Sequence, residues 1–271
     1  MNNVLGIFDS GIGGLTVLQS IRKRFEEIDI LYFGDHANVP YGDKSHDEIF
    51  ELTWNAVKWM FDQGCTLVIL ACNSASARAL RRIQQEKLKD YPGRNVLGVI
   101  RPTDEWILEQ GFKKAALFAT EATCQSKAYK KELEKTDPNL ELFCYAFPGW
   151  VPLIESGEVT GEQLDQVKIE VRQALSQLPE IEAIVLACTH YPVLFKTVRS
   201  VVPQEVQVVA QGEIVALSLQ DYLNHHPEYA QRISTGQQIR YYTTGDADRA
   251  TELSKQLMGL ETLFEHIDIS L

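Results

Sequence analysis

Two cysteines stand where strand-like apolar runs give way to polar residues. One run, "TLVILACNSA", places Cys72 before an asparagine and a serine, and the other, "AIVLACTHYP", places Cys188 before a threonine and a histidine. A helix that begins at such a point would stabilise a thiolate, the reactive form of cysteine. Cys72 and Cys188 are therefore candidate reactive thiols. The remaining cysteines are interpreted as inert packing residues: Cys65, Cys124 and Cys144.

Three chemistries could use this pair of thiols. Cys72, Cys188 and His190 could bind a metal, although the sequence offers no clear fourth ligand. The pair could instead form a redox dithiol, or one thiol could act as a nucleophile beside a histidine. Finally, the two thiols could exchange protons with opposite faces of one carbon, which inverts a stereocentre without a cofactor. Two like groups suit this last chemistry best, with Asp9 and His190 as acid–base helpers.

The bulk properties of the chain narrow its class. Its 271 residues are enough for one large or two modest domains. The formal net charge of -11 argues against a nucleic-acid partner, which would require a basic face. The sequence shows neither a secretory signal nor an apolar run of about 18 residues, so we expect a cytoplasmic protein without membrane contact. The cysteines show no C-x-x-C pair or zinc-finger spacing, and we expect all five to be free thiols.

Strand-like runs alternate with helix-like segments along the whole chain. This alternation predicts an α/β fold with mostly parallel sheets and helices on both faces. The pattern restarts near residue 101, so we expect two similar three-layer lobes, related by a pseudo-two-fold axis, with the active site in the cleft between them. The first lobe is assigned to residues 1–97, with 207–225 crossing back to it. The second is assigned to 98–206, with 226–271 returning to it.

The two halves of the chain carry similar residues at the ends of equivalent strands. Cys72 and Cys188 follow equivalent strands, and so do Asp9 and Thr120. Ligands bind outside the carboxyl ends of parallel strands, so we expect these residues to line one cleft with one cysteine on each wall. The expected strands are 4–8, 29–33, 67–71, 96–100, 115–119, 140–144, 183–186, 206–209 and 239–243. The main expected helices are 76–89, 104–110, 126–134, 161–178, 191–201, 214–224 and 247–259.

Two loops could add donors to that cleft. The glycine-rich turn Gly11–Gly14 follows the first strand and opens a helix, so its backbone could bind a carboxylate or phosphate. It could equally be a tight turn that permits close packing, and it matches neither G-x-G-x-x-G nor a P-loop. The loop 38–45, "NVPYGDKS", could offer the Tyr41 hydroxyl and backbone donors near Gly42.

Considered together, these stretches resemble the aspartate/glutamate racemase superfamily, and within it the bacterial glutamate racemases. The resemblance covers nearly the whole chain, with its motifs in the order and spacing typical of the family. The matching stretches are "GIFDSGIGGLTVL" (6–18), "YFGDHANVPYG" (32–42), "ACNSASA" (71–77), "GVIRP" (98–102), "ATEATCQSKAY" (119–129), "VPLIESG" (151–157), "ACTHYPVL" (187–194) and "TTGD" (243–246).

The resemblance implies roles for individual residues. Cys72 would deprotonate the D-amino acid and Cys188 the L-amino acid, assisted by Asp9 and His190 respectively. Glu155 matches a further acidic residue of the cleft. The positions that would hold the substrate's carboxylates and ammonium, with Asp9 and His190, are Ser10, Tyr41, Gly42, Asn73, Ser74, Thr120, Thr123 and Thr189.

The resemblance also implies an activity and its setting. It implies cofactor-independent racemisation of glutamate, without pyridoxal phosphate or metal, that supplies D-glutamate for peptidoglycan, and it implies a homodimer. The departures from the family pattern are Ser74 for a threonine, Ala187 for a glycine, the turn Arg101-Pro102-Thr103, and Ala210-Gln211 for an aspartate-containing pair. The alternatives are a racemase of aspartate or another amino-acid-like substrate, a non-catalytic binding protein, and a cysteine hydrolase, which would leave Cys72 without a role.

Overall fold

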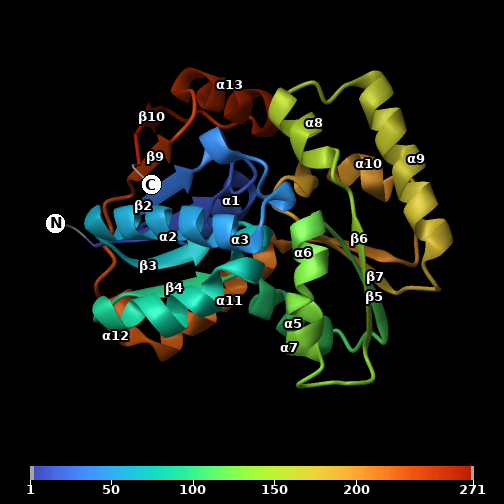
Figure 1. Ribbon diagram of the computed structural model, residues 1–271, viewed down its shortest axis with the longest axis horizontal. Coiled ribbons are helices and arrows are strands. Elements are labelled where there is room, and N and C mark those ends of the chain that lie inside the picture. The colour runs from blue at the N-terminus through green and yellow to red at the C-terminus, as the bar shows by residue number, and fades with distance from the viewer. Residues whose placement is uncertain (1–2, 270–271) are drawn as a thin grey trace.

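Two parallel β-sheets form the centre of the protein, one in each lobe (Figure 1). The structure, a computed structural model, describes residues 3–269. The larger sheet has six strands in the order β10-β9-β2-β1-β3-β4, and the smaller has four in the order β6-β5-β7-β8. The strand pairings are parallel throughout, as the alternation predicted. The strands are β1 Val4–Asp9, β2 Ile30–Gly34, β3 Cys65–Leu70, β4 Asn95–Gly98, β5 Lys114–Ala119, β6 Glu141–Ala146, β7 Ala183–Ala187, β8 Gln207–Ala210, β9 Ile239–Thr243 and β10 Phe264–His266.

The predicted similarity between the two halves is confirmed by the order of their strands. The order β2-β1-β3-β4 in the first sheet repeats as β6-β5-β7-β8 in the second, so β1 corresponds to β5 and β3 to β7. Asp9 ends β1 and Thr120 follows β5, while Cys72 and Cys188 follow β3 and β7. Equivalent strand ends therefore carry equivalent parts of the candidate site.

Helices cover both faces of each sheet. The α-helices are α1 Leu15–Arg24, α2 His46–Asp62, α3 Asn73–Arg78, α4 Leu80–Arg82, α5 Ile100–Glu109, α6 Glu121–Ser126, α7 Ala128–Leu133, α8 Trp150–Ser156, α9 Gly161–Gln177, α10 Phe195–Arg199, α11 Gln211–His225, α12 Pro227–Ala230 and α13 Ala247–Met258. Short 3₁₀ or π segments are η1 His36–Asn38, η2 Tyr41–Asp43, η3 Ile83–Lys87, η4 Leu88–Asp90 and η5 Tyr191–Leu194. Between residues 3 and 269, no helix is long and apolar enough to cross a membrane.

The hydrophobic cores follow the two-residue period of the strands. In β1, Val4 and Phe8 pack into the core beneath α2, whereas Leu5 and Ile7 pack on the opposite face beneath α1 and α11. In the second lobe, one face of the sheet is covered by α8, α9 and α10, and the other by α5 and α7. Because both faces of each sheet are buried at its centre, the central strands β1, β3, β5 and β7 consist mainly of consecutive apolar residues.

Local signals explain where the helices near the site begin and end. Thr120 caps α6, since its side chain accepts a hydrogen bond from the Thr123 amide. Lys127 then adopts a left-handed conformation with φ 54°, which separates α6 from α7. The helix expected over 126–134 corresponds to α7, and α6 before the break was not expected.

The C-terminal segment differs from its expected position. Strands β9 and β10 extend the sheet of the first lobe, because β9 pairs with β2, whereas residues 226–271 were expected to return to the second lobe. Helix α13 packs on that first lobe and reaches α8 of the second through hydrogen bonds from Arg249 and Gln256 to the Ser156 and Gly157 carbonyls (Figure 1). The strand β10 and the helix α8 were not predicted from the sequence.

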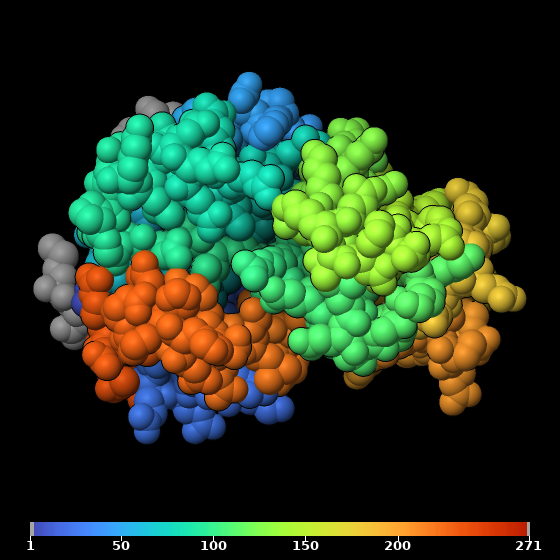
Figure 2. Space-filling view, turned by 90° about the horizontal axis from the view of Figure 1, so that it is seen from below, coloured from blue at the N-terminus to red at the C-terminus, as the bar shows by residue number. Residues whose placement is uncertain are grey.

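Helix α11 connects the two lobes. It leaves β8 of the second sheet and packs against α1 of the first lobe. The segment 207–225 was expected to cross back to the first lobe, but its first residues, Gln207–Ala210, form β8 beside β7, so the crossing begins at Gln211. In Figure 2, the orange segment with α11 and α12 lies along the first lobe, next to the green part of the second lobe that contains α5. A hollow of about 640 Å³ separates α11 from α4 and α7. The N-terminal residue of α11 is thus placed where the lobes meet.

Candidate active site

Both candidate thiols line the same small cavity between the lobes. Cys72 and Cys188 are each 5% exposed, and the space for the centre of a water molecule is about 10 Å³, room for about one water. The cavity is too small for an amino acid, so the structure shows the cleft in a closed state. The lining residues are Ser10, Tyr41, Gly42, Cys72, Asn73, Ser74, Thr120, Val151, Cys188, Thr189 and His190.

Cys72 lies on the wall formed by the first lobe. It occupies the N-cap position of α3, and its Sγ donates a hydrogen bond of 3.5 Å to the Ser10 hydroxyl. Burial and the nearby Asp9 carboxylate raise the pKa of the Cys72 thiol to about 12, while Ser10 and the Ala75 amide oppose the rise. In the closed state Cys72 is therefore a thiol, which is a proton donor.

Cys188 lies on the wall formed by the second lobe and has a different partner. Its Sγ is 3.9 Å from Nδ1 of His190, whose Nε2 is 2.6 Å from Oε1 of Glu155. Burial lowers the pKa of His190, but its hydrogen bonds to Cys188 and Glu155 outweigh burial and raise that pKa well above its ordinary value. The His190 ring therefore lies between the Cys188 sulfur and the Glu155 carboxylate.

Glu155 pairs with His190 on the side of the ring that faces away from Cys188. Burial opposes ionisation of this carboxyl group, yet its hydrogen bond and charge interaction with His190 lower its pKa to about 2. Its Oε1 also accepts the Ile12 amide of the first lobe at 2.9 Å. Glu155 therefore lies behind His190, outside the cavity lining, and also holds the lobes together.

Asp9 is fully buried behind the cavity. Its carboxylate accepts hydrogen bonds from the Gly11 amide and from the Thr189 hydroxyl of the opposite lobe. Burial raises the pKa of Asp9, and the His190 charge and these hydrogen bonds counteract that rise only in part. The side chain acts on Cys72 through its charge, since its hydrogen bonds go to other groups.

The glycine-rich turn binds carboxylates of the protein itself. The amides of Gly11 and Ile12 donate to Asp9 and Glu155 respectively, so these donors are already in use. A Cβ on Gly13 would lie 2.7 Å from the His190 backbone nitrogen, so a larger residue would push the lobes apart. The turn therefore serves close packing and orients the carboxylates of Asp9 and Glu155, which belong to the chain itself.

Hydroxyl groups form a bridge between the lobes at the other end of the cavity. Ser74 of α3 shares a hydrogen bond of 2.9 Å with Thr120, and Thr120 shares another of 3.0 Å with Thr123. A Cβ on Gly42 would lie 3.0 Å from the Thr120 Cβ, so glycine permits the close approach here. Thr123 lies behind Thr120 and does not line the cavity.

Tyr41 lines the cavity, but its hydroxyl is engaged elsewhere. It donates a hydrogen bond of 2.6 Å to Oδ2 of the buried Asp35, which also accepts from Asn38 and Thr244. In the closed state the single hydrogen of this hydroxyl is therefore donated to Asp35. Asp35 positions the loop that carries Gly42.

Comparisons with known proteins identify the family of the chain. Residues 15–218 match the model of the Asp/Glu/Hydantoin racemase family. The chain belongs to that family. It is 41% identical over 273 residues to the glutamate racemase of Ruegeria sp. strain TM1040, covering 96% of this chain and 98% of the relative.

Solved structures of the family share the whole fold. The glutamate racemase isoform of Bacillus anthracis aligns with a TM-score of 0.87 and 26% identity, covering 98% of both chains. The glutamate racemase of Francisella tularensis, solved in complex with D-glutamate, aligns with a TM-score of 0.86 and 26% identity, covering 99% of this chain and 98% of that one. The two-lobed α/β fold predicted from the sequence is therefore confirmed.

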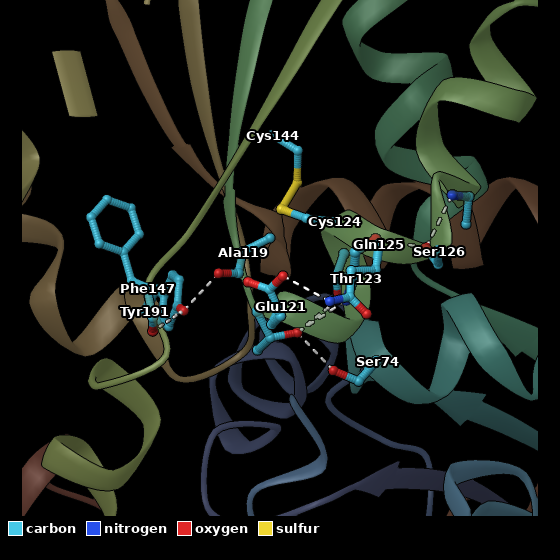
Figure 3. The surroundings of a disulfide bond; sticks show 12 residues. Ser74, Ala119, Glu121, Thr123, Cys124, Gln125, Ser126, Cys144, Phe147 and Tyr191 are labelled. Carbon is cyan, nitrogen blue, oxygen red and sulfur yellow. Dashed lines mark hydrogen bonds between the residues drawn. A yellow bond between two sulfur atoms is a disulfide. The ribbon is translucent and has the colours of Figure 1, made fainter. Parts of the chain in front are cut away.

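The prediction of five free thiols was wrong for this member of the family. Cys124 and Cys144 form a disulfide that joins α6 to the edge strand β6 (Figure 3). The spacing of 20 residues gave no hint of it, because the two residues meet only when β6 pairs beside β5. The free cysteines within residues 3–269 are Cys65, Cys72 and Cys188, all buried.

The metal alternative for Cys72, Cys188 and His190 gains no support from the geometry. Across residues 3–269, no group of three or more histidine, cysteine, aspartate or glutamate side chains is arranged to hold a metal ion. The histidine instead hydrogen-bonds Glu155 and Cys188. The arrangement has the form of two opposed acid–base groups.

Sequence reasoning missed a buried hydrogen-bond network behind Asn73. The amide of Asn73 is held by Tyr129 and Gln211, and Gln211 in turn contacts Thr103. The three residues that join Asn73 in this network are far apart in the chain, and two of them, Thr103 and Gln211, stood out in the sequence only as departures from the family pattern. No local spacing could have shown that they meet.

Proposed function

We propose that the protein interconverts L-glutamate and D-glutamate without a cofactor, through proton transfer by Cys72 and Cys188. The observation that carries this proposal is the placement of the two thiols on opposite walls of one cavity at equivalent strand ends. A pair of acid–base groups facing one carbon from both sides can remove a proton from one face and deliver another to the opposite face.

The two thiols have different surroundings in the closed state, and this supports different roles for them in one direction of the reaction. Cys72, whose pKa is raised to about 12, retains its proton, whereas Cys188 lies beside His190, whose pKa is raised well above its ordinary value. Cys188 would remove the α-proton of L-glutamate, and Cys72 would donate its proton to the opposite face to give D-glutamate. Reversal of both protonation states starts the reaction from D-glutamate.

The carbanionic intermediate requires donors fixed in advance around the substrate carboxylate. The cavity offers the side chains of Ser10, Asn73, Ser74, Thr120 and Thr189, all buried and all hydrogen-bonded within the protein. Tyr41 and Gly42 would contribute backbone contacts, and Thr123 and Glu155 would act from behind. Because the closed cleft excludes water, each of these hydrogen bonds would gain strength on closure.

Substrate entry requires the lobes to separate. The contacts that must break include the hydrogen bonds from Thr189 to Asp9, from the Ile12 amide to Glu155, and between Ser74 and Thr120. Each involves a residue of the proposed machinery, so opening would disable the site and closure would assemble it.

Glutamate is favoured over aspartate because the relatives with high identity over nearly the full chain are glutamate racemases. We also propose that the protein is a cytoplasmic homodimer that supplies D-glutamate for peptidoglycan, as the family resemblance implies. The Cys124–Cys144 disulfide is uncommon for a cytosolic protein, and its exposed Cys144 leaves it accessible to cellular dithiols.

The proposal is tested by incubating the pure protein with L- or D-glutamate in deuterated water. We expect loss of optical activity and exchange of the α-proton with both enantiomers, and unchanged rates after chelation of metals. Exchange with aspartate but not glutamate would transfer the assignment to the alternative substrate. Absence of exchange with any amino acid would favour a non-catalytic binding protein on this fold.

A further inference from the structure

Gln211 occupies a junction between the lobes directly behind the candidate active site. It is the first residue of α11, where the chain leaves β8 of the second sheet and turns toward α1 of the first lobe. Its side chain is 4% exposed. Its Oε1 accepts a hydrogen bond of 2.7 Å from Nδ2 of Asn73, and its Nε2 donates to the Thr103 hydroxyl at 2.6 Å and to the Tyr129 hydroxyl at 2.8 Å.

The direction of every hydrogen bond in this network follows from one backbone carbonyl. The Val99 carbonyl can only accept, so Thr103 donates its hydroxyl hydrogen to it, at 2.7 Å, and must accept from Gln211. The Nε2 of Gln211 therefore faces Thr103, and its Oε1 faces Asn73. Tyr129, which accepts from Gln211, has its hydrogen free to donate to Oδ1 of Asn73. The Asn73 amide is thus fixed in one of its two orientations.

This orientation matters because Asn73 follows Cys72 in the chain and lines the same cavity. Within residues 3–269, Nδ2 of Asn73 makes one hydrogen bond, to Gln211, so a second N–H remains for a ligand in the cleft. If the amide turned over, an oxygen would replace this N–H and repel a substrate carboxylate.

We propose that Gln211 is a positioning residue, which orients the Asn73 amide so that an N–H is presented to the substrate carboxylate beside Cys72. The inference rests on the proposed racemase function and adds a residue to its machinery. Gln211 touches neither the cavity nor either thiol, so it acts only through Asn73.

Packing alone would not require this set of side chains. Asn73, Thr103, Tyr129 and Gln211 are each at most 4% exposed, and buried polar groups are unfavourable unless they are paired. They come from α3, α5, α7 and α11, which span both lobes and the crossing segment. Because the network joins elements of both lobes, the orientation of Asn73 is set only when these elements are in their closed positions.

Two members of the network belong to segments at which the sequence departs from the pattern that the resemblance implies. Thr103 belongs to the altered turn that begins at Arg101, and Gln211 to the altered pair Ala210-Gln211. In the structure these two positions meet in a hydrogen bond of 2.6 Å.

The experiment is a double-mutant cycle between Gln211→Met and Asn73→Ala. Methionine keeps the volume and removes three hydrogen bonds, and we expect kcat to fall by about 10- to 100-fold with KM changed by less than about threefold. In the Asn73→Ala background, the same change at Gln211 should have no further effect on kcat. Exchange of the α-proton, followed by NMR at high enzyme concentration, keeps the slow variants measurable.

The following results distinguish the proposed role of Gln211 from the racemase function on which it rests. Wild-type kcat and KM in Gln211→Met, or multiplicative effects in the double variant, would overturn it while leaving the racemase assignment intact. An inactive wild type would instead remove the function on which it rests. Tyr129→Phe, which keeps the ring and removes the donor to Asn73, should reproduce the fall in kcat even if Gln211→Met folds poorly. Gln84→Met is the matched control, because Gln84 donates to the Val96 carbonyl away from the cavity, and its kcat should stay at the wild-type value.

Discussion

The Thr189 hydroxyl donates a hydrogen bond of 2.9 Å to Oδ2 of Asp9, and so joins the end of β7 in one lobe to the end of β1 in the other. Thr189 follows the second candidate thiol, whereas Asp9 is the charged group nearest the first. One hydrogen bond therefore links the environments of both thiols and forms only when the cleft is closed. It couples closure of the cleft to the pKa of Asp9.

Replacement of Thr189 by valine tests this coupling. The hydrogen bond lowers the pKa of Asp9, which burial has already raised, so its loss should raise that pKa further. We expect kcat/KM to fall roughly tenfold, which corresponds to about 1.4 kcal/mol, and the acidic limb of its pH profile to move to higher pH. Thr16→Val is the control, since Thr16 donates to the Thr189 carbonyl across the lobes without contacting Asp9. An equal shift of the acidic limb in both variants would contradict the assignment to Asp9.

Glu155→Gln should weaken the charge of His190 and affect the two reaction directions unequally. The Glu155 carboxylate helps to hold the pKa of His190 well above its ordinary value, so the amide should lower that pKa. At neutral and alkaline pH the imidazolium would be lost, and deprotonation of L-glutamate should slow more than that of D-glutamate. The measurement is α-proton exchange for each enantiomer across pH, and equal slowing at every pH would count against the pairing.

The same variant should change the dependence of stability on pH. The pKa of Glu155 is lowered to about 2 from an ordinary value of 4.5, so this group contributes stability above pH 4.5 that is lost as the pH falls toward 2. We expect the wild-type free energy of unfolding to decline over that window more steeply than that of Glu155→Gln. Urea unfolding at several pH values measures both slopes, and identical slopes would show that the pair contributes nothing.

Much of the fold and of the candidate site could be predicted, because the site residues lie at the ends of strands that are visible in the sequence. Apolar runs that end on Cys72, Cys188, Asp9 and Thr120 place these residues at the same edges of two parallel sheets, and the repeated strand order confirms the predicted similarity between the two halves. Periodicity is a local property, so it is visible in one sequence. The residues that line the cavity are almost all immediate neighbours of these strand ends.

The features that escaped prediction depend on contacts between distant segments. Gln211 and Tyr129 reach Asn73 only after α11 and α7 have packed against α3 and α5, and no spacing encodes that meeting. The Cys124–Cys144 disulfide likewise depends on the pairing of β5 with β6. The position of β9 beside β2 was missed because either sheet offered an edge that an added strand could extend.

Serine substitutions at the two thiols should separate the faces of the reaction. In Cys72→Ser, Cys188 can still remove and return the proton of L-glutamate, so exchange with retention should continue while racemisation falls by several orders of magnitude. Cys188→Ser should show the mirror result, with exchange confined to D-glutamate. NMR in deuterated water with chiral analysis of the product measures both quantities. Full racemisation by both variants would contradict the two-thiol mechanism.

Removal of the disulfide should weaken α6 and, through it, the substrate site. The disulfide lies one residue beyond Thr123 and close to the Ser74–Thr120 bridge (Figure 3). A cross-link that closes a loop of about 20 residues contributes about 3 kcal/mol to stability. We expect the double variant Cys124→Ser/Cys144→Ser to lose stability on this scale and to show a higher KM, because Thr120 and Thr123 lose their anchor to β6.

The disulfide variants provide their own controls, since the two cysteines act as one group. Each single serine variant should match the double variant in both unfolding free energy and KM. A dithiol reductant should shift the wild type to the same values and leave the double variant unchanged, because it reduces the disulfide to two thiols while its own thiols become oxidised. A reductant that lowers the stability of the double variant as strongly as that of the wild type would show that the effect arises elsewhere in the protein.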